Sequence, residues 1–222
     1  MNKRFLYVPL YIWMAFLLSS VILVLFPEID IGISNLFYKK GLGFVAGGTF
    51  YENILYHSIT YVTAGALLIP ILLYIYNFFT KKNILKVNAK VILYLGLVLS
   101  IGPGLIVNEL LKNHWGRPRP AETTLFGGTK EFTPPFIITD QDGYSFSSGH
   151  VAAAFFLLTL ALLVRKNKAF WVFLASSYGI AISYVRIAAG GHFFSDAVVS
   201  FFITYIISIM FYNIFFTDKE HV

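Results

Sequence analysis

The sequence predicts an all-α protein that is embedded in a membrane as a bundle of six transmembrane helices. Of its 222 residues, 57% are hydrophobic and 13% are charged, whereas a soluble domain carries about twice that charged fraction. The 23 Phe and 14 Tyr residues suit helices that lie in lipid and place aromatic rings at its interfaces. Six apolar segments follow one another along the chain: 5–26, 54–79, 91–111, 148–164, 169–185 and 194–216.

Most of these segments are long enough to cross a membrane, because about 20 helical residues at ~1.5 Å each span ~30 Å of hydrocarbon. The segments 148–164 and 169–185 are shorter. The four residues RKNK between them suffice for a tight turn, so we count two spans. The third segment contains SIGPG (100–104), which predicts a kink or local unwinding. We expect one domain that covers residues 1–222.

The first apolar segment follows Lys3 and Arg4, as the apolar part of a cleavable signal peptide would. Its apolar run is long, however, and it ends in LVLFPEID without the small residues of a cleavage site. The sequence therefore predicts a first span that is retained in the protein.

The basic residues in the connections predict the orientation of the spans. Six spans place both termini on one side, which would hold ten of the Lys and Arg residues against seven on the other. The excess predicts that the termini lie in the cytoplasm. The loop 112–147 and the turn 186–193 would then share the outer face.

The net charge of +6 admits nucleic acid as a partner, but the positive residues lie between apolar segments rather than on one soluble face. Attraction to anionic lipid headgroups explains this distribution better, so we expect a membrane partner and no nucleic acid. The absence of Cys excludes disulfides and thiolate metal sites. The sequence does not indicate an oligomeric state.

The stretch KNHWGRPRP after the third segment concentrates positive charge at the outer interface. Pro118 and Pro120 restrict the backbone and exclude helix, and Gly116 permits a turn. Lys112 and Arg119 would thus stand on a stiff corner that is suited to an anion. The alternative is that both are basic residues at a helix end whose charges reach toward water.

The stretch YSFSSGH precedes the fourth segment and contains Ser147, Ser148, Gly149 and His150. Serine and glycine at this position are typical of an ordinary helix cap. A helix N-terminus also offers free N–H groups and the positive end of its dipole to an oxyanion. His150 would stand in the first helical turn, beside any anion bound there.

The stretch YVRIAAGGHFFSD contains Arg186, His192 and Asp196. If a helix begins near His192, Asp196 lies on the same face four residues later. The carboxylate would then hold one imidazole N–H and leave the other nitrogen free to attack. The alternative is a purely structural hydrogen bond. Gly190 and Gly191 permit a sharp turn or a close approach of the backbone to a ligand.

The predicted topology brings these three stretches together, since each lies at the outer end of a span. Such a cluster suits a phosphate group: Lys112, Arg119 and Arg186 would neutralise its oxygens. The helix start at Ser148 and Gly149 would add backbone donors. Two histidines are then available for two separate tasks.

The three stretches resemble the signature of the type 2 phosphatidic acid phosphatase (PAP2) superfamily: K-x6-R-P, then P-S-G-H, then S-R-x5-H-x3-D. All charged and imidazole positions of the pattern match. Ser147 stands in place of the usual Pro, and Val185 in place of the usual Ser. Neither departure is ionisable, so they bear on fine geometry rather than on mechanism. The motifs cover 112–196, and six spans extend the resemblance to nearly the whole chain.

The resemblance implies a mechanism. His192, oriented by Asp196, would attack phosphorus and form a phosphohistidine, and His150 would protonate the leaving alkoxide and then activate water. The residues that would hold the phosphoryl oxygens are Lys112, Arg119, Ser148, Gly149 and Arg186. No metal or other cofactor is implied, and one motif carboxylate beside three cations is a poor setting for Mg²⁺.

A site at the outer interface favours a lipid that carries a phosphate monoester or a diphosphate. The stretch GRPRPAETTLFGGTKEFTPPF resembles bacterial lipid A phosphatases of the 4′-phosphatase type through its GRxRP core and its downstream FGG. That resemblance implies a bacterial inner membrane protein whose site faces the periplasm. Phosphatidylglycerophosphate and undecaprenyl diphosphate remain open as substrates.

Three basic residues of the outer loop have two interpretations. His114, Arg117 and Lys130 would contact a second phosphate or a sugar headgroup, or they would lie in a solvated loop, which we favour. Glu109 stands one turn before Lys112 and is expected to pair with it or with an arginine.

Two histidines fall outside the motifs. His57 is expected to be a helix or interface residue, and His221 to be part of a solvated tail. An anion-selective transporter is the rival from another class, although it would bind its substrate near the middle of the membrane rather than at the ends of spans. A lipid phosphotransferase that shares the phosphohistidine remains open.

Overall fold

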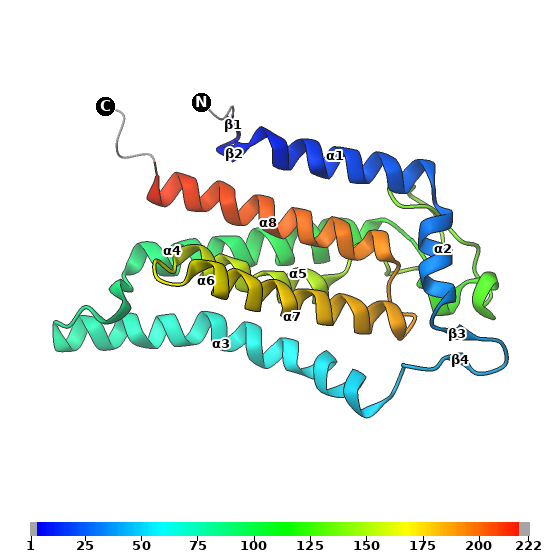
Figure 1. The fold of residues 1–222 in the computed structure, drawn as a ribbon, viewed down its shortest axis with the longest axis horizontal. Coiled ribbons are helices and arrows are strands. Elements are labelled where there is room, and N and C mark those ends of the chain that lie inside the picture. Colours follow the sequence, from blue (N-terminus) through cyan, green and yellow to red (C-terminus); the bar gives the residue numbers. More distant parts are fainter. Residues whose placement is uncertain (1–3, 218–222) are drawn as a thin grey trace.

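The computed structural model describes residues 4–217 and is helical over most of its length (Figure 1). Its long helices run roughly along the long axis of the molecule, which gives an elongated bundle. In chain order the helices are α1 (Leu10–Leu25), α2 (Glu28–Asn35), α3 (Phe50–Thr80), α4 (Ala89–Leu99), η2 (Ser100–Lys112), α5 (Gly149–Phe155), α6 (Leu157–Leu163), α7 (Lys168–Ala188) and α8 (Phe194–Phe216).

Strand structure among these residues is limited to two short antiparallel pairs. β1 (Arg4–Phe5) pairs with β2 (Val8–Pro9) before α1, and β3 (Tyr38–Lys39) pairs with β4 (Gly43–Phe44) between α2 and α3. The remaining short elements are single 3₁₀ turns: η1 (Ile84–Lys86), η3 (Pro120–Glu122) and η4 (Thr124–Phe126). The all-α class predicted from the sequence is confirmed.

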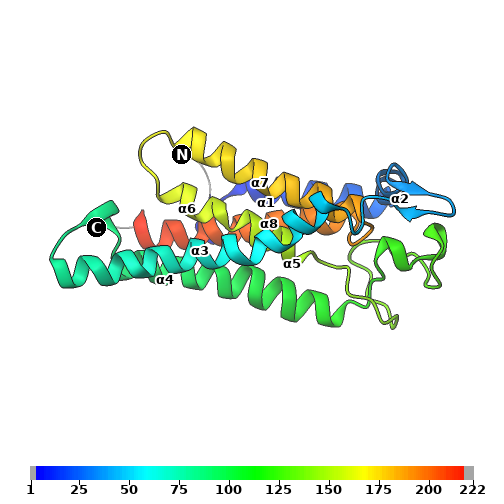
Figure 2. The same ribbon diagram turned by 90° about the horizontal axis from the view of Figure 1, so that it is seen from below.

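Helix α8 lies at the centre of the bundle, in contact with α1, α2, α4, α5, α6 and η2 (Figures 1 and 2). Small residues allow the inner helices to pack closely. A Cβ atom on Gly179 of α7 would lie 2.4 Å from the ring of Phe155 on α5, so any larger residue would separate the two helices. The close fit of α5 between α7 and α8 matters for function because α5 begins with the SSGH motif.

Within residues 4–217, four helices are long and apolar enough to cross a membrane: α3, α4 with η2, α7 and α8. The pair α1 and α2, bent by 80°, is a possible fifth, and the segment Gly149–Leu163 is shorter. Large apolar side chains on the outside of the bundle are exposed, for example Leu17, Ile69 and Phe173, as expected where lipid replaces water. The membrane class is supported, whereas the number of six spans stays a prediction.

The first predicted segment, 5–26, differs most from the structure. Its helix begins only at Leu10, after the β1–β2 hairpin, and ends at Leu25. A separate helix, α2, then begins after Pro27 and carries Glu28 and Asp30 in its first turn, where acidic side chains favour the positive end of the helix dipole. Helix α2 was not predicted, although a proline followed by acidic residues is a typical helix start.

The unwinding predicted at SIGPG is present. The hydrogen bonding of the third span changes from α-helical to π-helical at Ser100, and Pro103 lies inside the π-helical part. Proline lacks the N–H that an α-helix needs, which interrupts the α-helical pattern. The carbonyl of Pro103 accepts a hydrogen bond from the side chain of Asn108 at 2.8 Å. The span therefore reaches Lys112 with a wider winding than an α-helix has.

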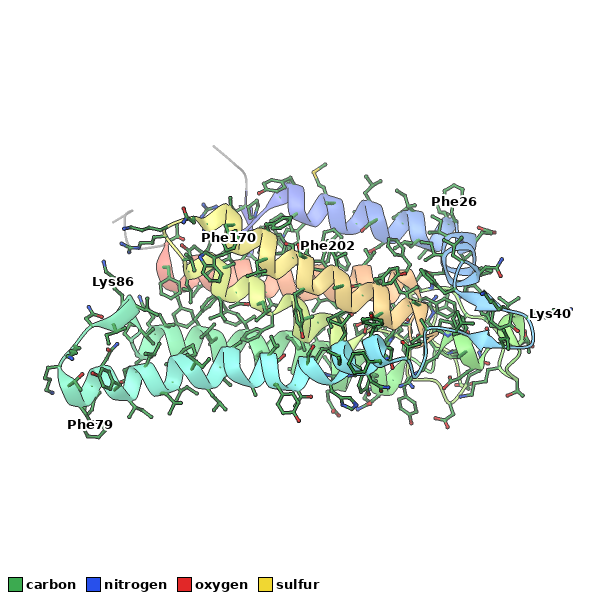
Figure 3. The ribbon with its side chains drawn as sticks, turned by 60° about the horizontal axis from the view of Figure 1, so that its bottom comes forward. Phe26, Lys40, Phe79, Lys86, Phe170 and Phe202 are labelled. Atoms are coloured by element: carbon green, nitrogen blue, oxygen red, sulfur yellow. The ribbon has the colours of Figure 1, made fainter. Side chains whose placement is uncertain are left out.

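The two ends of the bundle differ in content. The β1–β2 hairpin, the α3–α4 connection and the α6–α7 turn lie at one end, while α2, the β3–β4 hairpin and the loop 113–148 lie at the other (Figures 1 and 2). Figure 3 shows Lys86 and Lys40 at these opposite ends. Lys3, Lys219 and His221 lie outside the described residues.

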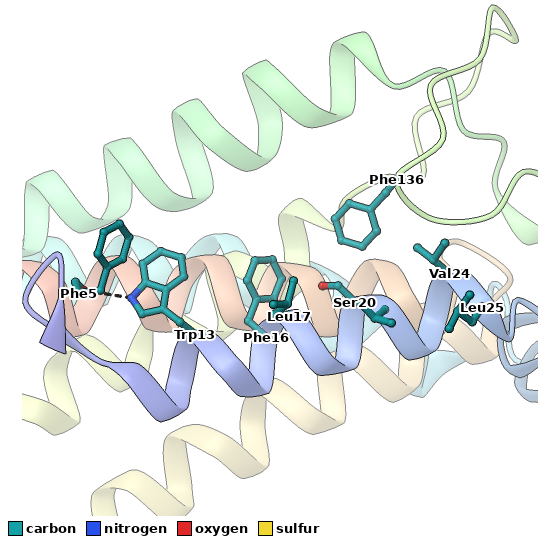
Figure 4. A pocket seen from close by; sticks show the side chains of 9 residues that line it. Phe5, Trp13, Phe16, Leu17, Ser20, Val24, Leu25 and Phe136 are labelled. Atoms are coloured by element: carbon teal, nitrogen blue, oxygen red, sulfur yellow. Dashed lines mark hydrogen bonds between the residues drawn. The ribbon is translucent and has the colours of Figure 1, made fainter. Parts of the chain in front are cut away.

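Helix α1 covers only one side of α8. There, Ile12 of α1 and Val8 of β2 pack against Ile206 and Ile209 of α8. On another side, α1 borders an apolar cavity of about 760 Å³ that its Trp13 and Phe16 line, with Phe136 of the loop 113–148 over the far end of the cavity (Figure 4). Such a lining is typical of a surface that contacts lipid chains.

Candidate active site

The residues predicted to form the site come together at the end of the bundle that carries α2. They stand at four places: the end of η2, the backbone before η3, the start of α5, and the junction of α7 and α8, which includes the last turn of α7 and the first turn of α8. Lys112, Arg119 and Arg186 lie near enough for their charges to act on one another. The charges of Arg119 and Arg186 also act on both His150 and His192.

The imidazole of His192 is buried and held at one nitrogen. Its Nδ1 lies 2.8 Å from the carbonyl oxygen of Ser145 and 3.5 Å from Oδ2 of Asp196. A carbonyl only accepts, so Nδ1 carries the proton and Nε2 of the neutral ring keeps its lone pair. Asp196 was predicted to hold this nitrogen, and the structure adds the carbonyl of Ser145 as the closer partner.

The electrostatic setting of His192 keeps its ring neutral. Burial lowers the pKa of His192, because desolvation penalises the charged imidazolium. Asp196 acts against burial and favours the charged form, while Arg186 and Arg119 oppose it. A ring that is neutral at pH 7 has the free electron pair that a nucleophile needs.

The carboxylate of Asp196 is fully buried and fixed by donors. It accepts hydrogen bonds from the hydroxyl of Ser145 at 2.6 Å, the backbone N–H of Phe193 at 2.9 Å and Nη1 of Arg117 at 2.5 Å. Its position in the first turn of α8 also suits a negative charge. The carboxylate is therefore a fixed anion beside His192.

The start of α5 combines a helix cap with close packing. Ser148 is the N-cap, and its Oγ accepts a hydrogen bond from the backbone N–H of Val151 at 3.4 Å. A Cβ on Gly149 would lie 2.3 Å from Oδ1 of Asn108, so glycine lets the start of α5 approach η2. His150 follows in the first turn, as expected.

Helix α3 contributes a wall of the site that the sequence analysis missed. The ring of Tyr56 lies 4.4 Å from the ring of His150 and 4.9 Å from the guanidinium carbon of Arg186. Oε1 of Glu52 lies 3.3 Å from Nη1 of Arg186. The spacing of Thr49 and Glu52 is typical of a helix start, but nothing in the sequence connects either residue to a motif more than 100 positions later.

Several buried donors of the site have no acceptor within residues 4–217. They are Nε of Arg119, Nε of Arg186 and Oγ of Ser147. Buried polar atoms in folded proteins are nearly always paired. These donors are therefore available to an anion that enters between the two arginines.

Glycine is required at the two positions of the α7–α8 turn for different reasons. Gly190 has φ = +68°, a backbone conformation that favours glycine. A Cβ on Gly191 would lie 2.3 Å from Nη2 of Arg186. The sharp turn that the sequence predicted is present, and it brings the backbone against the arginine.

The interpretation of Arg117 as a residue of a solvated loop is wrong. Its side chain is completely buried, with Nε donating to the carbonyl of Thr133 at 2.8 Å and the two terminal nitrogens to Asp30, Ser195 and Asp196. A buried arginine without carboxylates would be very costly. Asp30, which supplies one of them, comes from the unexpected helix α2.

The remaining residues that were considered beyond the signature positions of the three motifs lie near the surface. His114 is exposed, with Nδ1 3.1 Å from the carbonyl of Glu109, and Lys130 forms an ion pair with Glu122 at 3.5 Å. These positions fit the solvated loop. Glu109 accepts a hydrogen bond from Asn113 at 3.3 Å, and its expected pairing with Lys112 or an arginine is not found among the described residues. His57 is an exposed residue of α3, as expected.

Comparisons with known proteins agree with the geometry. Residues 92–220 match the model of the PAP2 superfamily. A lipid A 4′-phosphatase of Francisella tularensis subsp. novicida (strain U112) is 33% identical over 206 residues, which cover 90% of this chain and 92% of the relative. A lipid A 4′-phosphatase of Rhizobium leguminosarum is 31% identical over 205 residues, which cover 84% and 87%.

A third relative, a lipid A 4′-phosphatase of Rhizobium etli, is 31% identical over 189 residues, or 77% of this chain and 73% of the relative. No solved structure matches the chain. The family match covers more than half of the sequence and contains the three motifs that the structure gathers at one end of the bundle. The chain therefore belongs to the PAP2 superfamily and is a phosphoric monoester hydrolase.

Proposed function

We propose that this chain is a lipid A phosphatase that removes the 4′-phosphate through a phosphohistidine. The observation that carries the proposal is the gathering of three cations and two histidines at one end of an apolar bundle. The names of the relatives, all lipid A 4′-phosphatases, supply the substrate.

The first step uses His192. Its Nε2 lone pair attacks phosphorus, the bond between phosphorus and the sugar oxygen breaks, and His150 gives a proton to the departing alkoxide. Nδ1 keeps its proton, directed at the carbonyl of Ser145 and the carboxylate of Asp196. The positive charge that the ring gains on phosphorylation is thus stabilised by Asp196.

The second step reverses the task of His150. It takes a proton from a water molecule that attacks the phosphohistidine, the nitrogen–phosphorus bond breaks, and phosphate leaves with His192 restored. A bound phosphate offsets the positive charge of Lys112, Arg119 and Arg186, and this favours the protonated form of His150 in the first step. The ring of Tyr56 supports His150 from the side of α3.

The phosphoryl oxygens are held by charge that is in place before the reaction. Lys112, Arg119 and Arg186 provide it, and the unpaired buried nitrogens of both arginines support this assignment. The backbone at Ser148 and Gly149 adds N–H donors at the start of α5. Preorganised donors of this kind stabilise the transition state of phosphoryl transfer.

We propose the same membrane placement as the sequence predicts. The chain crosses a bacterial inner membrane six times, with cytoplasmic termini and a site that opens to the periplasm. The lysines and arginines at the end opposite the site support this orientation, among them Arg4, Lys81, Lys86 and Arg165. A substrate whose phosphate lies in the headgroup layer then reaches the cations without leaving the lipid.

Phosphate release by purified protein tests the proposal. The panel is lipid A, phosphatidylglycerophosphate, phosphatidic acid and undecaprenyl diphosphate, each with excess EDTA, and mass spectrometry of the lipid A product shows which phosphate is lost. We expect release from lipid A at the 4′ position in EDTA. If undecaprenyl diphosphate or phosphatidylglycerophosphate is turned over faster, that lipid is the substrate in place of lipid A. Acceptor-dependent turnover with little free phosphate would indicate a phosphotransferase.

A further inference from the structure

The guanidinium of Arg117 lies between two carboxylates. Its Nη1 is 2.5 Å from Oδ1 of Asp196, and its Nη2 is 2.8 Å from Oδ2 of Asp30. All three side chains are at most 1% exposed. Ser195 connects the two sides, because its hydroxyl accepts from Nη1 of Arg117 at 2.8 Å and donates to Oδ2 of Asp30 at 2.5 Å.

The hydrogen bonds define the charges in this group. Asp30 accepts from Arg117, from the hydroxyl of Ser195 and from the backbone N–H of Ser195 at 2.8 Å. Burial raises the pKa of Asp30, and the nearby charge of Asp196 raises it too, while the guanidinium of Arg117 and the hydroxyl of Ser195 lower it. The geometry decides for the charged form: every partner of Asp30 and Asp196 in these contacts is a donor, which suits ionised carboxylates and leaves a protonated one without an acceptor. Two negative charges and one positive charge give the group a net charge of −1.

The second carboxylate has an electrostatic consequence for His192. With Asp196 alone, Arg117 would cancel its charge, and the imidazole beside it would meet a neutral pair. With Asp30 on its far side, Arg117 is shared, and a negative charge remains next to His192. In a buried group such charges act strongly on their neighbours, because there is little water to screen them.

We propose that Asp30 is a positioning residue of the phosphatase reaction, which keeps the charge of Asp196 effective at His192 by sharing Arg117. The inference rests on the proposed function, since it concerns the positive charge that His192 gains when it is phosphorylated. Asp30 also holds the backbone of Ser195, and with it the first turn of α8 that carries Asp196.

The proposal gives a task to helix α2. Asp30 lies in its first turn and reaches Arg117 because α2 bends by 80° from α1 across the end of the bundle. Residue 30 lies outside the residues 92–220 that match the family model. A catalytic centre whose motifs all lie in the second half of the chain thus depends on a carboxylate from its first half.

The test uses Asp30→Asn, which preserves shape and removes the charge, with Glu28→Gln as the matched control. Glu28 is an exposed carboxylate on the same helix and lies outside the group. We expect Asp30→Asn to lower kcat on lipid A by about 10- to 100-fold, by analogy with residues that orient the ligands of metal sites, with little change in KM. Glu28→Gln is expected to match the wild type.

A second readout separates charge from mere structural support. The pKa of His192 is measured in folded protein by NMR of labelled histidine, with the signal assigned through His192→Gln. The groups that face this ring are the carbonyl of Ser145 and the side chains of Asp196, Arg186, Arg119 and His150. Asp30→Asn is expected to lower the pKa of His192 further.

The double variant Asp30→Asn with Arg117→Gln completes the test. It removes one charge of each sign, so the group returns to −1, and the pKa of His192 is expected to return toward the wild-type value. This variant leaves no unpaired buried arginine. It can therefore be compared with the wild type even if Asp30→Asn does not fold. An unchanged His192 pKa in Asp30→Asn, or a lower one in the double variant, would overturn the inference. Lack of phosphate release by the wild type would instead contradict the proposed function, and the NMR result would still decide the role of Asp30.

Discussion

The ring of Tyr56 lies 4.4 Å from the ring of His150, although the two residues belong to different helices and only His150 lies in a family motif. The same tyrosine ring faces the guanidinium of Arg186 at 4.9 Å. One aromatic side chain of α3 thus touches both the proposed acid and a proposed phosphate ligand. This contact leads to the first prediction.

Removing the ring of Tyr56 is expected to lower activity, whereas removing its hydroxyl is not. Tyr56→Phe keeps both ring contacts and should retain the wild-type rate. Tyr56→Leu loses them, and because such contacts contribute about 0.5–1.5 kcal/mol each, or about 1–3 kcal/mol together, kcat on lipid A should fall by about 5- to 150-fold. Initial rates of phosphate release measure both variants. A loss of similar size in Tyr56→Phe would instead assign the role to the hydroxyl.

The contrast between the motifs and Tyr56 shows what the sequence can predict. The residues of the three motifs were found because their order and spacing match a family pattern, and apolar length located α8 at 194–216 as the structure has it. Tyr56 and Glu52 do not belong to any of the three motifs. They reach the site only because α3 packs along α5 and α7, and a single sequence does not reveal which helices are neighbours.

Arg117 and Asp30 illustrate a second limit. An arginine in a polar loop is usually solvated, and its burial depends on a carboxylate that comes from a helix after the first span. That helix was missed because its eight residues are too few to stand out as an apolar span, although Pro27 with two acidic residues after it is a typical helix start. The partners of a buried charge follow from the fold, so local pattern alone could not identify them.

His192→Ala is expected to abolish phosphate release while the protein stays folded. The side chain is buried but makes one short polar contact, to the carbonyl of Ser145, so its loss leaves the bundle intact. Loss of a nucleophile typically reduces kcat by about 10⁴-fold or more. Phosphate release and size-exclusion elution in detergent measure the two properties. Substantial activity of a well-folded His192→Ala protein would remove His192 as the nucleophile.

His192 should also make the stability of the protein depend on pH. Because burial lowers the pKa of His192 in the folded state, the unfolded chain takes up a proton there below about pH 6.5 while the folded protein does not. Acid therefore favours unfolding through this residue. The effect is absent above pH 6.5 and grows as the pH falls toward the lower folded value.

The matched comparison for this pH dependence is His192→Gln, which keeps a polar side chain but does not titrate. Its melting temperature in detergent should fall less between pH 7 and pH 5 than that of the wild type. Equal slopes for the two proteins would show that His192 has a similar pKa in the folded and unfolded states.

Gly191→Ala is expected to weaken phosphate binding without unfolding the protein. The new Cβ would lie 2.3 Å from Nη2 of Arg186, the free end of a flexible side chain, so the guanidinium must move while the helices stay in place. Gly96→Ala is the matched control, since no atom lies within 4 Å of its new Cβ. If Arg186 binds the substrate phosphate as proposed, it does so in the ground state as well as in the transition state. KM for lipid A should therefore rise in Gly191→Ala and stay unchanged in Gly96→Ala. A normal KM in Gly191→Ala would mean that the position of this guanidinium does not limit how the enzyme holds its substrate.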